Sequence, residues 1–147
     1  MRFHRVIAGL ALLLATAASQ AFDFKTVGAA PAILYDAPST KGTKLFVVPR
    51  GTPLEVVLAY GDWLKVRDVS GDLSWTEAKS LSNKRNVIVR TPNLKVRTAP
   101  DEAGATAFIA DKGVLLEVAD TSAGGWIKVR HRDGASGYVK SADIWGL

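Results

Sequence analysis

Two short segments of the chain place an indole beside two positive charges in the same order. Segment 126–130 reads Trp-Ile-Lys-Val-Arg, and segment 63–67 reads Trp-Leu-Lys-Val-Arg. Side chains alternate between the faces of a β-strand, so Trp126, Lys128 and Arg130 share the face opposite the aliphatic residues. The aliphatic face suits a core. The other face offers a flat plate for stacking on a sugar ring, a proline or a peptide backbone, beside cations that can pair with a carboxylate.

Further aromatic candidates are Trp63, in segment 63–67, and one aromatic residue on the strand that follows each of the two segments. Tyr138 and Trp75 follow the two segments and would lie beside them in a sheet. Each aromatic residue also has a structural alternative, in which its ring covers one end of the fold or a contact between modules. The candidate ligand-binding residues are therefore Trp126, Tyr138, Lys128, Arg130, Trp63 and Trp75. Trp145 has no counterpart in the first copy, and we expect it to hold two modules together.

The sequence offers little for covalent or metal chemistry. It has no cysteine, so thiol nucleophiles, disulfides and thiolate metal sites are excluded. Of its two histidines, His4 lies in the first 21 residues, and His131 lies between arginines and lacks metal-ligand spacing. The loop acids of the second half have no spacing that enforces the facing carboxylates of a glycosidase, and they are Asp101, Glu102, Asp111 and Asp120. We therefore expect no enzyme activity, no metal and no cofactor.

The N-terminus has the pattern of a secretory signal peptide. Arg2 and Arg5 precede an apolar run over residues 6–18, and small residues at 19 and 21 match a signal-peptidase site. The run is shorter than the ~20 residues that a membrane-spanning helix needs. We expect a signal peptide over residues 1–21, a secreted, periplasmic protein and no membrane span after cleavage. An uncleaved anchor is the alternative.

Cleavage would leave 17 Lys and Arg against 14 Asp and Glu, a net charge of +3. A nucleic-acid-binding domain usually has a strongly basic face. We therefore expect no nucleic-acid partner.

The rest of the chain contains an internal duplication. Residues 34–56 align with residues 96–118 at an offset of 62. One extra residue near Ala123 raises the offset to 63, and residues 63–81 then align with residues 126–144. A period of about 60 residues is too long for a solenoid unit, so two globular modules are expected.

Each copy predicts an all-β module, the first over residues 22–82 and the second over residues 83–147. In the second copy, alternation and turn residues predict strands at 87–89, 94–98, 107–111, 114–119, 126–131 and 137–140. Asp133-Gly134 predicts a two-residue hairpin turn, and residues 141–144 predict one turn of tight helix. Short strands with closely spaced turn residues suggest that each module is a small, partly open barrel, and the short linker predicts that the two barrels contact each other.

The order of these motifs resembles the bacterial Src-homology-3-like domain over about residues 24–147. The resemblance is carried by Lys95-Val96-Arg97, Ala99-Pro100, Gly125-Trp126-Ile127-Lys128-Val129 and Gly137-Tyr138-Val139. The first copy departs from it, with Leu34-Tyr35-Asp36 and Leu73-Ser74-Trp75-Thr76 at the equivalent places. The resemblance implies two tandem β-barrels of five or six strands, an envelope location and a binding role toward peptidoglycan or peptides.

Residues and resemblance together favour an exported, non-enzymatic binding module. Its expected partner is the stem peptide of peptidoglycan or an extended segment of an envelope protein. Trp126 and Tyr138 would form the apolar wall, and Lys128 or Arg130 would anchor an anionic group. One alternative is a structural or assembly subunit whose aromatic faces contact a partner protein. A remote alternative is a cell-wall hydrolase.

Overall fold

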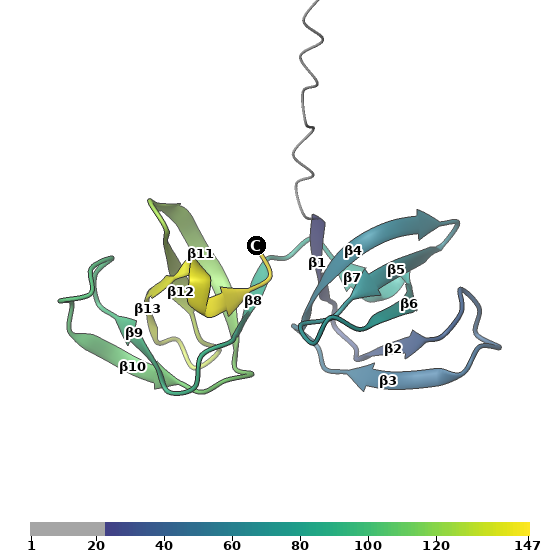
Figure 1. Ribbon diagram of the computed structural model, residues 1–147, viewed down its shortest axis with the longest axis horizontal. Helices are drawn as coiled ribbons and strands as arrows, with labels where there is room; N and C mark the ends of the chain where they lie inside the picture. Colours follow the sequence, from purple (N-terminus) through teal and green to yellow (C-terminus); the bar gives the residue numbers. More distant parts are fainter. Residues whose placement is uncertain (1–22) are drawn as a thin grey trace, which may run out of the picture.

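The computed structural model describes residues 23–147, except for the side chains of residues 122 and 123, so the predicted signal peptide lies outside the described residues. The described chain forms two lobes, each built on one antiparallel sheet of seven strands (Figure 1). Within residues 23–147, no helix is long and apolar enough to cross a membrane.

The first module contains seven strands in the order β3-β2-β6-β5-β4-β1-β7. They are β1 (Asp23–Val27), β2 (Ala32–Tyr35), β3 (Lys44–Val48), β4 (Pro53–Tyr60), β5 (Trp63–Arg67), β6 (Leu73–Glu77) and β7 (Leu81–Ser82). A single 3-10 turn, η1 (Ala78–Ser80), precedes β7.

The second module repeats this order as β10-β9-β13-β12-β11-β8-β14. Its elements are β8 (Asn86–Val89), β9 (Leu94–Arg97), β10 (Thr106–Ala110), β11 (Leu115–Ala123), β12 (Trp126–Arg130), β13 (Ser136–Lys140), η2 (Ser141–Asp143) and β14 (Ile144–Trp145). The all-β duplication is confirmed, and the tight helical turn lies where the sequence predicts it.

The expectation of small, partly open barrels of five or six strands is borne out only in part. Strand pairing does not close either sheet into a barrel, because β3 and β7 in one module and β10 and β14 in the other are edge strands. Each module also has seven strands, not five or six. The short strands β7 and β14 have two residues each, too few to show alternation, and β1 follows the expected signal peptide so closely that it resembles a lead-in.

The Asp133-Gly134 hairpin also differs from the prediction. The N–H of Gly134 donates to the carbonyl of His131 at 2.9 Å, and the N–H of His131 donates to Ala135 at 2.8 Å. Only the glycine of the predicted pair has a positive φ, of 95°. The connection is thus a four-residue turn that ends on glycine, a common position for glycine in type I turns.

A tight hairpin connects β11 and β12 instead. Gly124 and Gly125 both have positive φ, 51° and 84°, as the primed hairpin turns require. This turn lies directly before Trp126 and so sets the start of β12. The extra residue of the second copy lies in β11, whose pairing with β12 shifts register twice where β4 and β5 shift once.

The two cores follow the predicted alternation. Ile127 and Val129 are buried in the second module, as Leu64 and Val66 are in the first. The two clusters contain mostly aliphatic side chains, with Val87, Val96, Leu116 and Val139 in one and Val27, Leu34 and Leu54 in the other.

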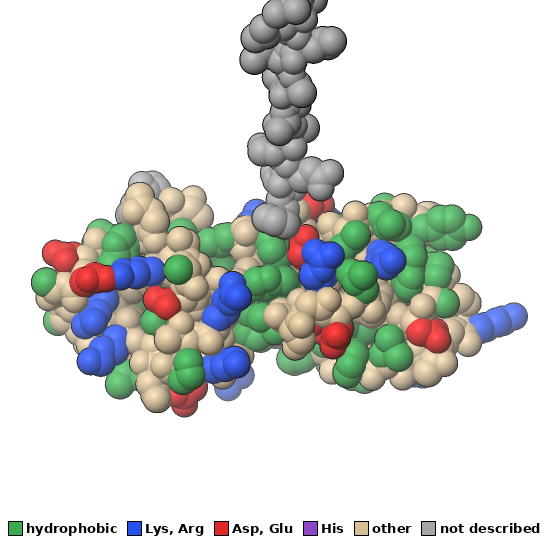
Figure 2. Space-filling model, viewed as in Figure 1, with side chains coloured by type: hydrophobic (Ala, Val, Ile, Leu, Met, Phe, Trp, Pro, Cys, Tyr) green, Lys and Arg blue, Asp and Glu red, His purple; other side chains and the backbone are tan. Residues whose placement is uncertain are grey.

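The modules contact each other, as the short linker predicts, and hydrophobic side chains lie at the waist between the lobes (Figure 2). The ring of Phe24 contacts Trp145 edge-on, with centroids 5.0 Å apart, so Trp145 has the predicted structural contact. The Asn86 amide group donates to the carbonyl of Gly51 at 2.9 Å, and its backbone N–H donates to Thr26 Oγ1 at 3.3 Å. Polar and aromatic contacts therefore join the two lobes.

Candidate ligand-binding groove

The outer face of β12 is continuous with that of β13. In their register Trp126 lies opposite Lys140, and Lys128 lies opposite Tyr138. Tyr138 in turn pairs with Arg97 of β9, so a row of polar and aromatic side chains crosses three strands. Because the alternate residues are buried, this face is the only one of the two that a ligand can reach.

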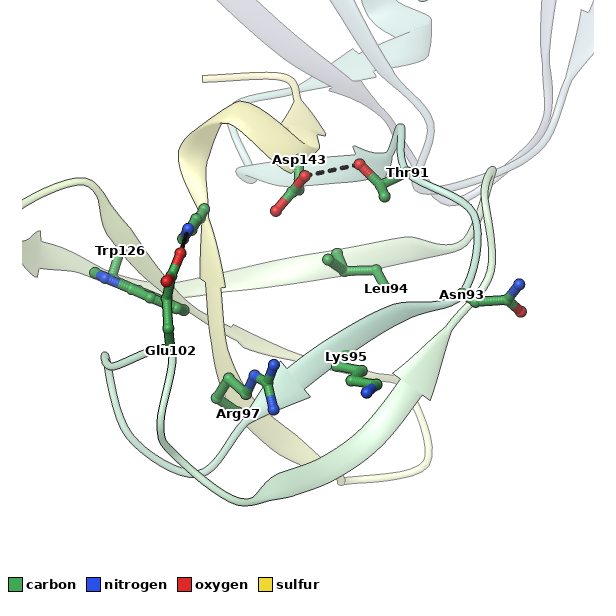
Figure 3. A pocket seen from close by; sticks show the side chains of 9 residues that line it. Thr91, Asn93, Leu94, Lys95, Arg97, Glu102, Trp126 and Asp143 are labelled. Carbon is green, nitrogen blue, oxygen red and sulfur yellow. Dashed lines mark hydrogen bonds and ion pairs between the residues drawn. The ribbon is translucent and has the colours of Figure 1, made fainter.

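A cavity of about 480 Å³ lies at one end of this face, and we name it the Trp126 groove. It is lined by Thr91, Asn93, Leu94, Lys95, Arg97, Glu102, Trp126, Lys140 and Asp143. Figure 3 shows Trp126 and Glu102 toward one end of the groove and Asn93 toward the other. The half-buried indole thus forms one wall, beside charges of both signs.

Three charged groups of the groove already contact other side chains of the module. The ammonium of Lys140 is 5.7 Å from the centroid of the Trp126 ring and forms an ion pair with Glu102. Asp143 accepts a hydrogen bond from the Thr91 hydroxyl at 2.7 Å, as Figure 3 shows. These contacts order the groove without filling it.

Two further cations of the groove come from β9. The guanidinium of Arg97 donates to the carbonyl of Gly104 at 3.2 Å, which leaves other N–H groups for a ligand. Lys95 is exposed, and its side chain forms no ion pair within the described residues. Three cations against two acids give the groove a mild positive excess.

The predicted site residues divide into three groups in the second module. Trp126 lines the groove, whereas Tyr138 and Lys128 lie on the same face outside its lining. Arg130 belongs elsewhere, because its Nε and Nη2 donate to Glu117 at 3.2 and 3.1 Å. A cavity between the modules includes Arg130 in its lining.

The cations that line the groove were not predicted as site residues from the sequence, and they are Lys140, Lys95 and Arg97. Lys140 carried a usable signal, because it alternates with Val139 and so shares a face with Tyr138. The neighbours from β9 had no such signal, since their proximity to Trp126 depends on long-range strand pairing.

The equivalent place in the first module is occupied by a tyrosine. Tyr35 is only 6% exposed, and its ring contacts Trp63 edge-on at a centroid distance of 5.4 Å. The duplication aligns Tyr35 with Arg97 and Trp63 with Trp126. The segment Leu34-Tyr35-Asp36, which departs from the family pattern, therefore places a tyrosine ring against one side of the Trp63 indole.

The remaining aromatic candidate of the first module, Trp75, lies among other side chains of its sheet. Its ring is 6.5 Å from that of Tyr60, and the ammonium of Lys65 lies 6.0 Å from its centroid. Trp75 and Trp63 are both partly exposed. They do not line the groove of the second module.

The described part of the chain holds no group of three or more His, Cys, Asp or Glu side chains that could bind a metal ion. His131 lies with its Nδ1 3.1 Å from Asp133, at the surface turn between β12 and β13. The chemistry that the groove offers is stacking on an indole and pairing with charged groups.

Comparison with known proteins supports the duplication independently. The sequence profile described as the bacterial SH3 domain matches residues 28–83 and again residues 91–146. No curated protein matches the chain.

Among solved structures the chain is similar to NlpC2 from Trichomonas vaginalis, with 12% identity and a TM-score of 0.40 over 86% of this chain and 48% of that one. It is also similar to NlpC1 from the same organism, with 13% identity and a TM-score of 0.40 over 92% of this chain and 50% of that one. The chain thus spans about half the length of these two proteins.

Proposed function

Because the chain belongs to the bacterial SH3 domain family, whose domains are binding modules commonly associated with the cell wall, we propose that it is an exported, periplasmic, non-enzymatic binding module. Its ligand is an extended peptide, either the stem peptide of peptidoglycan or a segment of an envelope protein. The ligand lies in the Trp126 groove, and nothing is chemically transformed.

The observation that supports this proposal most strongly is the accessible indole of Trp126 beside charges of both signs. A half-buried tryptophan presents a rigid apolar surface on which a peptide backbone can lie. Lys95 and Arg97 can pair with a ligand carboxylate, because a guanidinium or ammonium binds that group through charge-assisted hydrogen bonds. The second carboxylate oxygen of Asp143 can accept a hydrogen bond from a ligand amine, because Thr91 donates to Oδ1. A stem peptide carries both kinds of group.

One specific observation favours the alternative of a structural or assembly subunit. The edge strand β3 exposes Leu45, Phe46 and Val47, the last of them by 69%. An exposed apolar edge strand is a surface on which another chain can pair.

The hydrolase alternative draws no support from the Trp126 groove. The two acids of the groove already have partners, because Glu102 pairs with Lys140 and Asp143 accepts a hydrogen bond from Thr91.

Sedimentation with purified cell-wall sacculi tests the proposal. Trp126→Ala should weaken binding by about 1–3 kcal/mol, the scale of a lost aromatic anchor. The matched variant Trp63→Ala removes the aligned indole of the first module and should bind like the wild type. Circular dichroism should show that both variants keep the fold.

Sacculus binding by Trp126→Ala equal to that of the wild type would remove the groove from the proposal. Co-purification of one stoichiometric envelope protein, with no binding to sacculi, would favour the assembly subunit. Clearing in a zymogram would support the hydrolase.

A further inference from the structure

A second cavity, of about 770 Å³, lies between the two modules and is separate from the Trp126 groove. We name it the inter-module cleft. The first module contributes Val27, Ala29 and Arg50 to it, and the second contributes Leu115 and Arg132. The cleft exists only because the two lobes contact each other.

The charges of the cleft are strongly unbalanced. Its lining includes four Arg and Lys side chains but a single acid, Glu117. That acid is already engaged, because Lys84 forms an ion pair with it and Arg130 donates to it at 3.1 Å. These two cations hold the pKa of Glu117 below its usual value, so the carboxylate is ionised at neutral pH and pairs with both of them.

The two other cations of the cleft are Arg50 and Arg132. Hydrogen bonds from Ala135 and His131 lower the pKa of Asp133, and the charge of the neighbouring Arg132 is a further cause of that shift. Within the described residues, neither Arg50 nor Arg132 forms an ion pair. Asp133, the chain neighbour of Arg132, is occupied by the backbone N–H of Ala135 at 2.8 Å and by His131. The cleft therefore presents one unpaired guanidinium from each module, and guanidinium groups favour carboxylate or phosphate partners.

A buried acceptor in the same cleft lacks a donor. The side chain of Asn86 lies between the modules, and the residue is only 7% exposed. Its Nδ2 donates to the carbonyl of Gly51 at 2.9 Å, which fixes the orientation of the amide. Its Oδ1 is buried and accepts no hydrogen bond. A buried acceptor of this kind favours a ligand that brings an N–H or O–H donor.

The rest of the cleft is lined in part by aliphatic side chains. Val27 and Ala29 lie on the first-module side, and Val114 and Leu115 lie on the second-module side. Leu115 and Val114 are only partly buried, so they retain surface that a ligand can cover. Apolar walls favour a ligand with aliphatic groups.

We infer that the inter-module cleft binds an acidic peptide segment with aliphatic side chains. A backbone N–H of the peptide would donate to Asn86 Oδ1, while its carboxylates pair with Arg50 and Arg132. Its aliphatic side chains would lie against Leu115 and Ala29. A phosphate polymer would satisfy the two arginines, but it offers neither the N–H donor nor the apolar groups. The site is independent of the Trp126 groove and does not rest on the proposed function.

Calorimetric titration of the full chain tests this site. The probes are a blocked synthetic peptide of alternating glutamate and leucine, its counterpart with glutamine in place of glutamate, and inorganic polyphosphate. The acidic peptide should bind, and the double variant Arg50→Gln/Arg132→Gln should lower the affinity for this peptide at least tenfold.

Two controls accompany this test. The control pair Lys41→Gln/Lys112→Gln also removes one charge from each module, outside the cleft, and should leave the affinity for the peptide unchanged. Trp126→Ala should bind the peptide like the wild type.

Nuclear magnetic resonance locates the ligand, because the side-chain amide signal of Asn86 should shift when the acidic peptide is added. Equal losses in the two double variants would mean unspecific charge attraction and would overturn the site. Binding of polyphosphate without the peptide would overturn the ligand class. Loss of peptide binding in Trp126→Ala would assign the peptide to the groove and overturn a separate site.

Discussion

The ammonium of Lys140 lies 5.7 Å from the centroid of the Trp126 indole, directly across the β12–β13 pairing. Glu102, from the loop after β9, forms an ion pair with the same ammonium. One cation therefore contacts both the proposed stacking surface and a carboxylate. An exposed ion pair contributes little to stability, so Lys140 can exchange Glu102 for a ligand carboxylate at small cost.

If Lys140 exchanges Glu102 for a ligand carboxylate, substitutions of these two residues should have opposite effects on ligand binding. Lys140→Met should weaken binding to sacculi several-fold, because a cation is lost from the groove. Glu102→Gln should bind as well as the wild type or better, because Lys140 is released. Lys128→Met, on the same face but outside the groove lining, is the control and should have no effect. Sedimentation titrations would measure all three, and equal losses for Lys140→Met and Glu102→Gln would show that Glu102 contacts the ligand.

The contact between Phe24 and Trp145 predicts that the modules stabilise each other. Trp145→Ala removes an edge-on aromatic contact between the lobes and should lower the free energy of unfolding by about 1–3 kcal/mol. Urea unfolding followed by circular dichroism would measure the loss. Ile109→Ala, a substitution at an exposed side chain of β10, should change stability little. The prediction fails if the two variants have the same midpoint.

Gly137 predicts a steric limit between β13 and β9. An added Cβ would lie 2.5 Å from the carbonyl oxygen of Arg97 and 2.7 Å from Val96 Cγ1, and the backbone oxygen cannot rotate away. Gly137→Ala should therefore destabilise the second module by about 1–3 kcal/mol, as overpacking does. The control Gly28→Ala places its Cβ 3.4 Å from the carbonyl of Ser80, an ordinary contact. Thermal unfolding of both variants checks the prediction, which requires Gly137→Ala to melt lower.

The pKa of Glu117 predicts a pH-dependent part of stability. Hydrogen bonds from Lys84 and Arg130 lower this pKa from its ordinary value of 4.5. A carboxyl group whose pKa is lower in the folded state stabilises the fold above the unfolded pKa, and this stabilisation is lost as the pH falls through the folded pKa. Glu117→Gln should thus be less stable than the wild type at neutral pH, with a difference that shrinks as the pH falls below 4.5.

Denaturant unfolding over a pH series measures this difference. Because the Glu117 side chain is partly exposed, the difference at neutral pH should also shrink in about 1 M salt, where the Debye length is about 3 Å. A difference that stayed constant across pH and salt would assign the effect of the substitution to shape, not to charge.

The local pattern of this chain determined which side chains face the core and which face outward. Period-two alternation alone places Trp126 opposite Ile127 and Val129, and the structure buries both aliphatic residues. The duplication and its extra residue are equally visible in the sequence, because they need only comparison of the chain with itself. The seven strands of each sheet and the four-residue turn that ends on Gly134 were not predicted, since strand pairing and loop geometry depend on more than neighbouring residues.

Only the tertiary structure decided which outward-facing groups meet. Glu102 and Arg97 reach the Trp126 groove through strand pairing and a loop that lie more than twenty residues upstream of the indole. Arg130 shares its strand face with Trp126, yet it pairs with Glu117 at the inter-module cleft. Alternation assigns a side chain to a face through the geometry of its own backbone, whereas its neighbours are set by register and by contacts between distant segments.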